Sequence, residues 1–265
     1  TLPLTFLHRS LPDADVYFVA NQGDKPISFN GAFRAAGRTP ELWDPQTAEV
    51  RVLPQFTRLS KTVEVPMKLQ PLESAFIVFR NANGQSGATA TATAVNYPDK
   101  KVLATVSTPW TVAFEQGKGG PESRQTFSTL ADWSKNADSK IKYFSGHAIY
   151  TNSFKVSKLP EGETYIDLGK VMVMAKVKIN GQEVGGVWTP PYRLNITKFL
   201  KKGVNTVEVD VVNNWRNRLI GEKNMPESER FTHQSFTYLN KDSELQESGL
   251  IGPVEIQNYS YELKK

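Results

Sequence analysis

Polar and apolar residues alternate most clearly within residues 164–218. The run Lys176–Ile179 reads polar, apolar, polar, apolar, and Asn180-Gly181 follows it directly. An Asn-Gly pair between two strand-like runs predicts a β-hairpin, because both central residues of a type I′ turn need a positive φ angle. After a second turn at Lys201–Gly203, valines alternate with acidic residues over residues 207–211. This alternation predicts a strand with one buried and one solvated face.

Residues 1–80 show a series of shorter strand patterns separated by turn residues. The run Val63–Leu69 alternates, but it contains Pro66, which lacks an amide hydrogen and predicts an edge strand. The run Ala75–Phe79 is apolar throughout and predicts a central strand. Further strands are expected at residues 15–20, 29–33, 50–52 and 55–59, with a corner at residues 41–45. Short strands joined by turns indicate a small antiparallel β-sandwich.

Residues 81–94 carry small and polar side chains and no large apolar one. We interpret them as a linker between a first domain, residues 1–80, and a second domain, residues 95–265. The alternative is that the Thr-Ala alternation within this segment forms an edge strand. In the second domain only residues 128–133 predict a short helix, with Ser128 or Thr129 as its cap. The fold class expected for the whole chain is all-β.

Composition narrows the class of protein further. The 265 residues carry a formal net charge of +5, and no run of basic residues is longer than two. Nucleic-acid binding needs clustered basic residues, so no nucleic-acid partner is expected. The chain has no cysteine, which excludes disulfides and thiolate metal sites. No apolar run approaches the ~20 residues of a membrane helix, so no membrane insertion is expected. The sequence opens at Thr1 without a basic-then-apolar leader, as expected of a processed or excised piece.

Several motifs of the second domain are similar to those of a known domain. They are INGQEVG at Ile179–Gly185, PPYRLNIT at Pro190–Thr197 and LKKGVNTVEVDVVN at Leu200–Asn213. Together they resemble the galactose-binding-like, family 2-type sugar-binding jelly roll of large glycoside hydrolases. The resemblance implies a jelly-roll β-sandwich over residues 95–265.

The first domain carries a resemblance of its own. The motifs DADVYFVAN at Asp13–Asn21, ELWDP at Glu41–Pro45 and PLESAFIVF at Pro71–Phe79 are similar to the β-module of α-L-rhamnosidase-like enzymes, glycoside hydrolase family 106. The motifs STPWTVAFE and NNWRNRLIG resemble the C-terminal jelly roll of the same enzymes. In that family the catalytic carboxylates lie on a preceding barrel, and no part of this sequence has the pattern of such a barrel. The resemblance therefore implies the C-terminal β-sandwich region of such an enzyme, periplasmic or extracellular in a bacterium.

Two segments have the chemistry of sugar contact, which combines flat aromatic rings with planar polar groups. The candidate residues are Trp188, Tyr192 and Arg193 in one segment, and Trp215, Arg216, Asn217 and Arg218 in the other. Each segment follows a predicted strand, and loops at the end of a sandwich commonly bind ligands. The alternative is that both tryptophans belong to the core and that the arginines dock the jelly roll on its neighbours.

The remaining candidate chemistry is sparse. His8 and Arg9 would lie at a domain or cleft interface if the resemblance holds; the alternative is a surface pair at the start of a strand. The three histidines lack ligand spacing, and no D-x-D-x-D loop is present. No cofactor is expected, although structural calcium is an alternative that the resemblance allows. Glu41, Asp44, Glu227 and Glu229 are candidate catalytic acids, with turn-forming or solvated acids as the alternative.

These observations predict a carbohydrate-related function. The expected role is the non-catalytic C-terminal accessory region of a glycoside hydrolase that acts on plant or bacterial polysaccharide, with rhamnose-containing chains among the candidates. The expected partners are an oligo- or polysaccharide and an upstream catalytic barrel of the same polypeptide. One alternative is that the chain supplies residues to the active site of that enzyme. Another is a pair of structural or protein-interaction modules without sugar binding.

Overall fold

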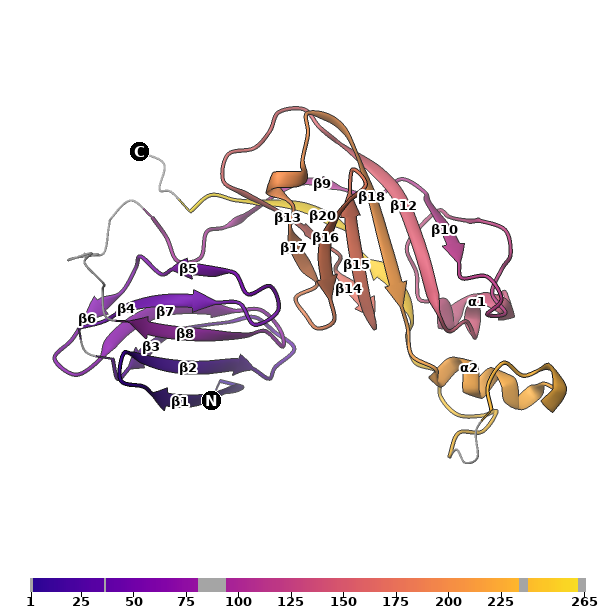
Figure 1. The fold of residues 1–265 in the computed structure, drawn as a ribbon, viewed down its shortest axis with the longest axis horizontal. Coiled ribbons are helices and arrows are strands. Elements are labelled where there is room, and N and C mark those ends of the chain that lie inside the picture. The colour runs from indigo at the N-terminus through magenta and orange to yellow at the C-terminus, as the bar shows by residue number, and fades with distance from the viewer. Residues whose placement is uncertain (1, 36, 81–93, 234–237, 262–265) are drawn as a thin grey trace. The chain divides into compact units, whose positions relative to one another are not determined.

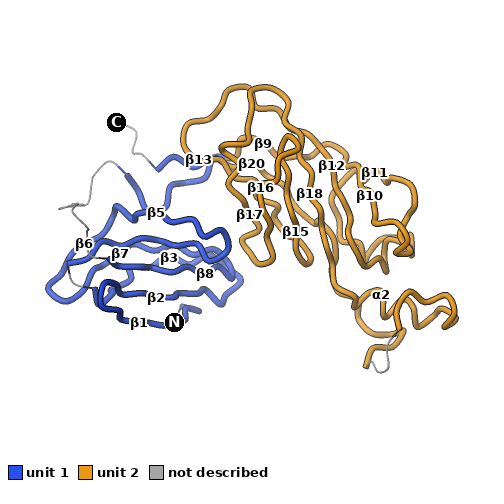
Figure 2. The backbone as a smooth tube through the Cα atoms, viewed as in Figure 1, with its two compact units in different colours: residues 1–101, 259–265 blue, residues 102–258 orange. Residues whose placement is uncertain are grey.

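The computed structural model describes residues 2–35, 37–80, 94–233 and 238–261, and these form a nearly all-β chain (Figure 1). Two compact units are distinguished, one of residues 1–101 with 259–265 and the other of residues 102–258 (Figure 2). The predicted linker falls mostly on residues 81–93, outside the described residues, so that boundary stays a prediction. The all-β fold class is confirmed.

Unit 1 is a sandwich of two antiparallel sheets. A five-stranded sheet has the order β1-β2-β8-β4-β5, and a three-stranded sheet has the order β3-β7-β6. The strands are β1 (Leu4–Ser10), β2 (Ala14–Asn21), β3 (Ile27–Phe33), β4 (Thr39–Trp43), β5 (Val50–Val52), β6 (Thr57–Arg58), β7 (Val63–Leu69) and β8 (Ser74–Arg80). The core lies between the sheets and contains Val19, Val65, Leu69, Ile77 and Phe79. The central position predicted for residues 75–79 is confirmed, since β8 is the third strand of five.

The prediction of an edge strand at residues 63–69 is wrong, because β7 lies between β3 and β6. β7 tolerates a proline in this position because β6 is only two residues long and pairs with Val63 and Glu64 alone. Pro66 is paired with Asn30 of β3, and its carbonyl oxygen accepts a hydrogen bond from Asn96 Nδ2 at 3.2 Å. The proline therefore sits beyond the end of the outer neighbour, where no strand needs its missing amide hydrogen.

The last described residues belong to unit 1 because side chains of this unit hold them. Tyr261 accepts a backbone hydrogen bond from Val95 at 2.9 Å. The Arg51 guanidinium lies 5.2 Å from the ring centre of Tyr97 and 5.3 Å from that of Tyr261. Asn96 is buried and exchanges hydrogen bonds with Gln55. Two segments far apart in sequence are thus fastened to the same sandwich.

Unit 2 is a larger sandwich. Its sheets have the orders β11-β10-β12-β18-β15-β16, β17-β13-β20-β9 and β14-β19. The strands are β9 (Lys100–Thr105), β10 (Trp110–Phe114), β11 (Gln125–Phe127), β12 (His147–Val156), β13 (Glu163–Asp167), β14 (Lys170–Met172), β15 (Met174–Ile179), β16 (Gln182–Val187), β17 (Arg193–Asn195), β18 (Gly203–Val212), β19 (Gly249–Gly252) and β20 (Glu255–Tyr259). The Asn180-Gly181 hairpin is confirmed, with φ angles of 52° and 79° between β15 and β16.

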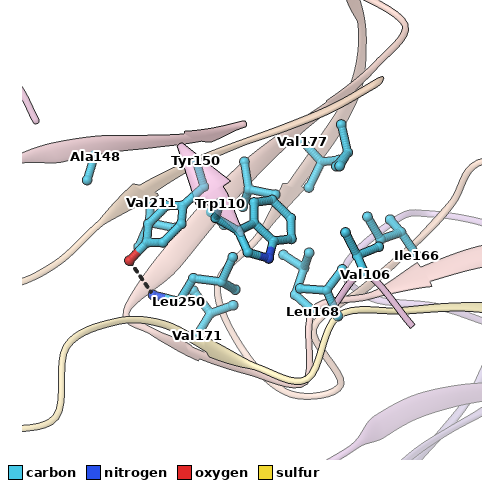
Figure 3. Close-up of a cluster of buried hydrophobic side chains, with 14 of the residues drawn as sticks. Val106, Trp110, Ala148, Tyr150, Ile166, Leu168, Val171, Val177, Val211 and Leu250 are labelled. Atoms are coloured by element: carbon cyan, nitrogen blue, oxygen red, sulfur yellow. Dashed lines mark hydrogen bonds between the residues drawn. The ribbon is translucent and has the colours of Figure 1, made fainter. Parts of the chain in front are cut away.

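The core of unit 2 joins the inward side chains of its sheets (Figure 3). Trp110, Tyr150 and Val211 come from the six-stranded sheet, and Ile166 and Leu250 come from the facing strands. The Tyr150 hydroxyl accepts hydrogen bonds from Trp133 Nε1 at 2.6 Å and from the Leu250 amide at 3.3 Å. Burial raises the pKa of Tyr150, so it stays a neutral phenol that fastens the two layers.

The helical segments are short and lie outside the sheets. They are η1 (Trp133–Lys135), α1 (Ser139–Lys142), η2 (Thr197–Phe199), α2 (Arg216–Gly221), η3 (Glu222–Asn224) and η4 (Glu227–Glu229). The helix predicted at residues 128–133 is wrong. Asp132 instead caps η1 through Ser134, and its carboxylate also accepts a hydrogen bond from the Ser248 amide at 2.9 Å. This contact spans more than a hundred residues, and no local pattern predicts it.

Candidate functional site

The two tryptophan segments leave the same end of the six-stranded sheet. β15 lies between β16 and β18, and its Ala175 is paired with Val187 on one side and Val211 on the other. Trp188 follows Val187 directly, and Trp215 comes four residues after Val211. Because neighbouring strands lie about 4.8 Å apart, the two segments begin about 10 Å from each other.

In the first segment the Trp188 ring is exposed, whereas Tyr192 and Arg193 contact other residues of unit 2. Trp188 is 54% exposed. Tyr192 is partly buried against the core, and its carbonyl oxygen accepts a hydrogen bond from the Leu168 amide at 2.8 Å. The Arg193 guanidinium lies 5.6 Å from the ring centre of Tyr165. Of the predicted sugar contacts in this segment, Trp188 therefore presents the largest free surface.

The second segment enters α2, which follows the end of β18 (Figure 1). Trp215 is 49% exposed. The Arg216 backbone amide donates to Asn214 Oδ1 at 3.1 Å, and its Nε donates to the Glu244 carbonyl at 3.1 Å. Both Trp188 and Trp215 lie outside the buried core, so the interpretation of these two residues as core is wrong.

Asn217 is buried and holds a neighbouring loop. Its Nδ2 donates to the Gln246 carbonyl at 2.6 Å, and its Oδ1 accepts from the Gln246 amide at 2.8 Å. Nδ2 also lies 3.4 Å from Ser248 Oγ. The side-chain amide of Asn217 therefore forms the same pair of hydrogen bonds with the Gln246 backbone that a neighbouring strand would form. Its donor and acceptor atoms are used within the fold.

Arg218 is also buried, beside Glu222. Its Nη2 donates to the Lys118 carbonyl, its guanidinium lies 5.1 Å from the Phe231 ring centre, and its Nε lies 3.9 Å from Glu222 Oε1. Burial lowers the pKa of Arg218, and the Glu222 carboxylate partly offsets that change. Glu222 also accepts hydrogen bonds from the backbone amides of Phe231 and Thr232. Arg218 and Glu222 therefore hold the segments around Lys118 and Phe231 to the helical segment that follows Trp215.

A polar cluster that the sequence did not reveal lies at the same end. His147, the first residue of β12, is paired with Val212. Its Nδ1 lies 3.1 Å from Asp210 Oδ1, and its backbone amide donates to Glu115 Oε2 at 3.1 Å. These residues are far apart in sequence, and the strand register alone brings them together. They add hydrogen-bonding groups to the sheet end that carries both exposed tryptophans.

His8 and Arg9 point to opposite faces of the five-stranded sheet. His8 is paired with Tyr17 and stacks on its ring, with centroids 4.1 Å apart. Its Nε2 lies 3.0 Å from Asp15 Oδ1, and the other oxygen of Asp15 accepts from Arg38. Arg9 is exposed on the outward face. An interface role for the two as a pair stays a prediction, and Arg9 is the one with a free surface.

The candidate catalytic acids of unit 1 are engaged in local structure. Glu41 Oε2 accepts from Trp43 Nε1 at 2.8 Å, and Asp44 Oδ1 accepts from the amides of Gln46 and Thr47.

Within the described ranges, no cluster of three or more His, Cys, Asp or Glu side chains could hold a metal ion. Among the same residues, no helix is both long and apolar enough to span a membrane.

The class of protein follows from comparison of these two sandwiches with known families. Residues 131–245 match the family model for the glycosyl hydrolase 2 galactose-binding domain-like fold. Residues 1–58 match the family model for alpha-L-rhamnosidase. The predicted resemblance to α-L-rhamnosidase-like enzymes and to the family 2-type jelly roll is thereby confirmed.

Individual relatives point the same way. A rhamnosidase from Novosphingobium sp. PP1Y superposes with a TM-score of 0.86 and 34% identity, over 97% of this chain and 24% of that one. A protein of Formosa agariphila (strain DSM 15362 / KCTC 12365 / LMG 23005 / KMM 3901 / M-2Alg 35-1), named "Putative beta-glucuronidase", is 38% identical over 156 residues, which are 49% of this chain and 13% of that protein. The chain thus spans about a quarter of the first relative and an eighth of the second. Its homologues are glycoside hydrolases.

Proposed function

We propose that this chain is a non-catalytic accessory region of a glycoside hydrolase, and that the loop end of its jelly roll binds oligo- or polysaccharide. The observation that supports this most directly is the position of Trp188 and Trp215. Both rings are half exposed, and both stand on the same end of one sheet. Aromatic faces of this kind cover the C–H faces of sugar rings.

The surroundings of the two rings favour binding further. Asn217, Arg218 and Glu222 are buried and fix the chain on which Trp215 stands. A platform that is ordered before the ligand arrives loses less conformational entropy on binding. His147 and Asp210 supply a ring nitrogen and carboxylate oxygens for sugar hydroxyls at the same end. A non-catalytic role fits the candidate acids of unit 1, whose oxygens already bind local donors.

Calorimetric titration of the chain with a panel of polysaccharides, rhamnose-rich pectins included, tests this function. We expect saturable heat with one class. Trp188→Ala and Trp215→Ala should each weaken that binding at least about tenfold, which is about 1.4 kcal/mol. The control is Phe6→Ala, which removes an exposed aromatic ring from unit 1 and should leave binding unchanged.

Thermal unfolding of the same variants separates binding from stability. Because both tryptophans are half exposed, their loss should cost well below the ~3–5 kcal/mol of a buried tryptophan. No heat with any polysaccharide would contradict the proposal and favour a scaffold. A large loss of stability in Trp215→Ala would likewise assign that ring to structure.

A further inference from the structure

The outward face of the five-stranded sheet in unit 1 carries a continuous row of large apolar side chains. Leu7 is paired with Phe18, Phe18 with Phe76, Phe76 with Trp43, and Trp43 with Val50. Each of the five strands contributes one residue. Successive side chains of a strand alternate between faces, and the alternate residues, such as Tyr17 and Ile77, belong to the core. The row therefore lies on the side of the sheet that faces away from the core.

Much of this outward row is open to solvent. Leu7 is 53% exposed and Val50 is 54% exposed, while Phe18, Phe76 and Trp43 are partly exposed. The adjacent row adds Val16 and Val52. An antiparallel sheet with one face on the core normally turns a polar face to water. Here one row of that face is apolar across the whole width of the sheet, and in the adjacent row only Arg9 and Glu41 are charged.

Charged groups flank the row, and one of them covers part of it. The Arg80 guanidinium lies 4.6 Å from the Trp43 ring centre, and its Nε lies 3.9 Å from Glu41 Oε2. Arg9, exposed on β1, is paired with Val16. An apolar centre with a charged rim is the usual composition of a surface that another protein domain covers.

Unit 2 shows how a solvated face of this protein looks. On the outward face of its six-stranded sheet, Thr151, Glu208 and Lys178 are paired side by side, and the next row places Asp210 beside Lys176. Lys178 and Glu208 form an ion pair at 2.8 Å. Because the two outward faces belong to the same chain, the overall amino-acid composition of the chain does not explain why the outward row of unit 1 is apolar.

We propose that the outward row of unit 1 (Leu7, Phe18, Phe76, Trp43 and Val50) is an intramolecular docking surface, covered by a further domain of a longer glycoside hydrolase polypeptide. The similar rhamnosidase carries three quarters of its chain beyond the part that this chain matches. Residues 1–58, which match the alpha-L-rhamnosidase model, contribute four of the five strands. Aliphatic side chains at Leu7, Val50 and Val52 favour a protein over a glycan, because sugar sites combine aromatic rings with polar groups. The inference rests on the proposed accessory role.

Cysteine labelling tests the docking surface, because these 265 residues contain no cysteine. Leu7→Cys and Val50→Cys are placed in the 265-residue chain and in the full polypeptide that the natural gene encodes. Val204→Cys is the matched control, since Val204 is 57% exposed on the outward face of the polar sheet. We expect all three to react with a thiol reagent at similar rates in the short chain. In the full polypeptide the first two should react at least about tenfold more slowly, while the control keeps its rate.

Two outcomes would overturn this proposal. Equal rates at Leu7→Cys and Val50→Cys in both polypeptides would leave the face uncovered. Slowing that appears only after polysaccharide is added would make a glycan the occupant. Amide hydrogen exchange of β1 and β5 in the unsubstituted proteins gives a second measurement that needs no variant. Sugar binding is titrated on the short chain alone, so a failure of that function is distinguishable from a failure of docking.

Discussion

Asn217 shows how much of this site depends on one side chain. It is almost fully buried, and its amide forms two hydrogen bonds with the backbone of Gln246. Asn217→Ala removes both bonds and leaves polar groups of the loop without their partner. We expect the free energy of unfolding to fall by about 1–3 kcal/mol. Urea denaturation followed by circular dichroism measures the change.

The neighbouring Asn214 provides the control for this substitution. Its side chain is exposed: its Nδ2 donates to the side-chain oxygen of Gln246 rather than to the backbone, and its Oδ1 accepts from the Arg216 amide. Asn214→Ala should lower the free energy of unfolding by less than about 1 kcal/mol, since exposed sites are usually tolerant. If both variants lose the same stability, Asn217 does not hold the loop as inferred.

Tyr97 makes the stability of unit 1 dependent on pH. Burial raises the pKa of its phenol to about 12, and the nearby Arg51 guanidinium partly counteracts that rise. The phenol of an unfolded chain has a pKa near 10. The folded state therefore favours the neutral phenol, and this contribution is complete below about pH 10. It is lost as the pH rises from about 10 to about 12.

We expect Tyr97→Phe to unfold like the natural chain at pH 8 and to lose less stability on going to pH 11. Phenylalanine keeps the ring between its neighbours but has no proton to lose. Tyr238→Phe changes an exposed ring and serves as the control. Urea midpoints at the two pH values give the comparison. Parallel losses in Tyr97→Phe and the natural chain would contradict this assignment.

The candidate site could be predicted only in part from its residues. The sequence selected Trp188 and Trp215 as candidate sugar contacts and left a core role open as the alternative, and the structure shows that both rings are about half exposed. It grouped Asn217 and Arg218 with them, although both are buried and bind backbone carbonyl groups. The deciding partners, Gln246 and Lys118, are distant along the chain. A residue pattern contains no information about such contacts.

At the scale of elements, the hairpin between β15 and β16 depends on its turn. Gly181 has a φ of 79°, which a residue with a Cβ adopts only with strain. Gly181→Ala should therefore lower the free energy of unfolding by about 1 kcal/mol. Asn180 adds to the effect of the turn, because its Nδ2 donates to the Phe199 carbonyl and its Oδ1 accepts from the Thr206 amide. Thermal unfolding of the variant measures the loss.

Gly186, in the same hairpin, is the matched control. It lies within β16, and a Cβ there would first meet the Ala175 carbonyl oxygen at 3.4 Å, an ordinary contact. Gly186→Ala should leave the melting temperature nearly unchanged or raise it slightly, since glycine weakens a strand. Equal losses in the two variants would show that the turn conformation is not the cause.

Elements whose determinants are local were predictable, and elements held by distant contacts were not. The hairpin needs only Asn180 and Gly181, and both have positive φ angles. The position of β7 depends instead on the short β6, which pairs with only two of its residues. The segment before Trp133 has a helix-like composition, but the Asp132 carboxylate is bound to Ser248. In both cases a tertiary contact overrode a correct local rule.

At the scale of the whole molecule, the two units have separate hydrophobic cores. The buried cluster around Ile77 and Phe79 shares no residue with the one around Trp110 and Tyr150. A chain with two cores need not unfold in a single cooperative step. The buried Trp133 is the most informative place to test this, because it stacks on Tyr150 and also donates a hydrogen bond to its hydroxyl.

We expect Trp133→Ala to destabilise unit 2 by about 3–5 kcal/mol, the usual cost of truncating a buried tryptophan, and to leave unit 1 unchanged. Ile77→Ala should do the reverse, at a cost of about 2–5 kcal/mol. Limited proteolysis during heating, with mass spectrometry of the fragments, identifies which unit opens first. In Trp133→Ala the early cuts should fall within residues 102–258, and in Ile77→Ala within the first hundred residues. If either substitution opened both units at one temperature, the two cores would form a single folding unit, since separate cores transmit no such loss.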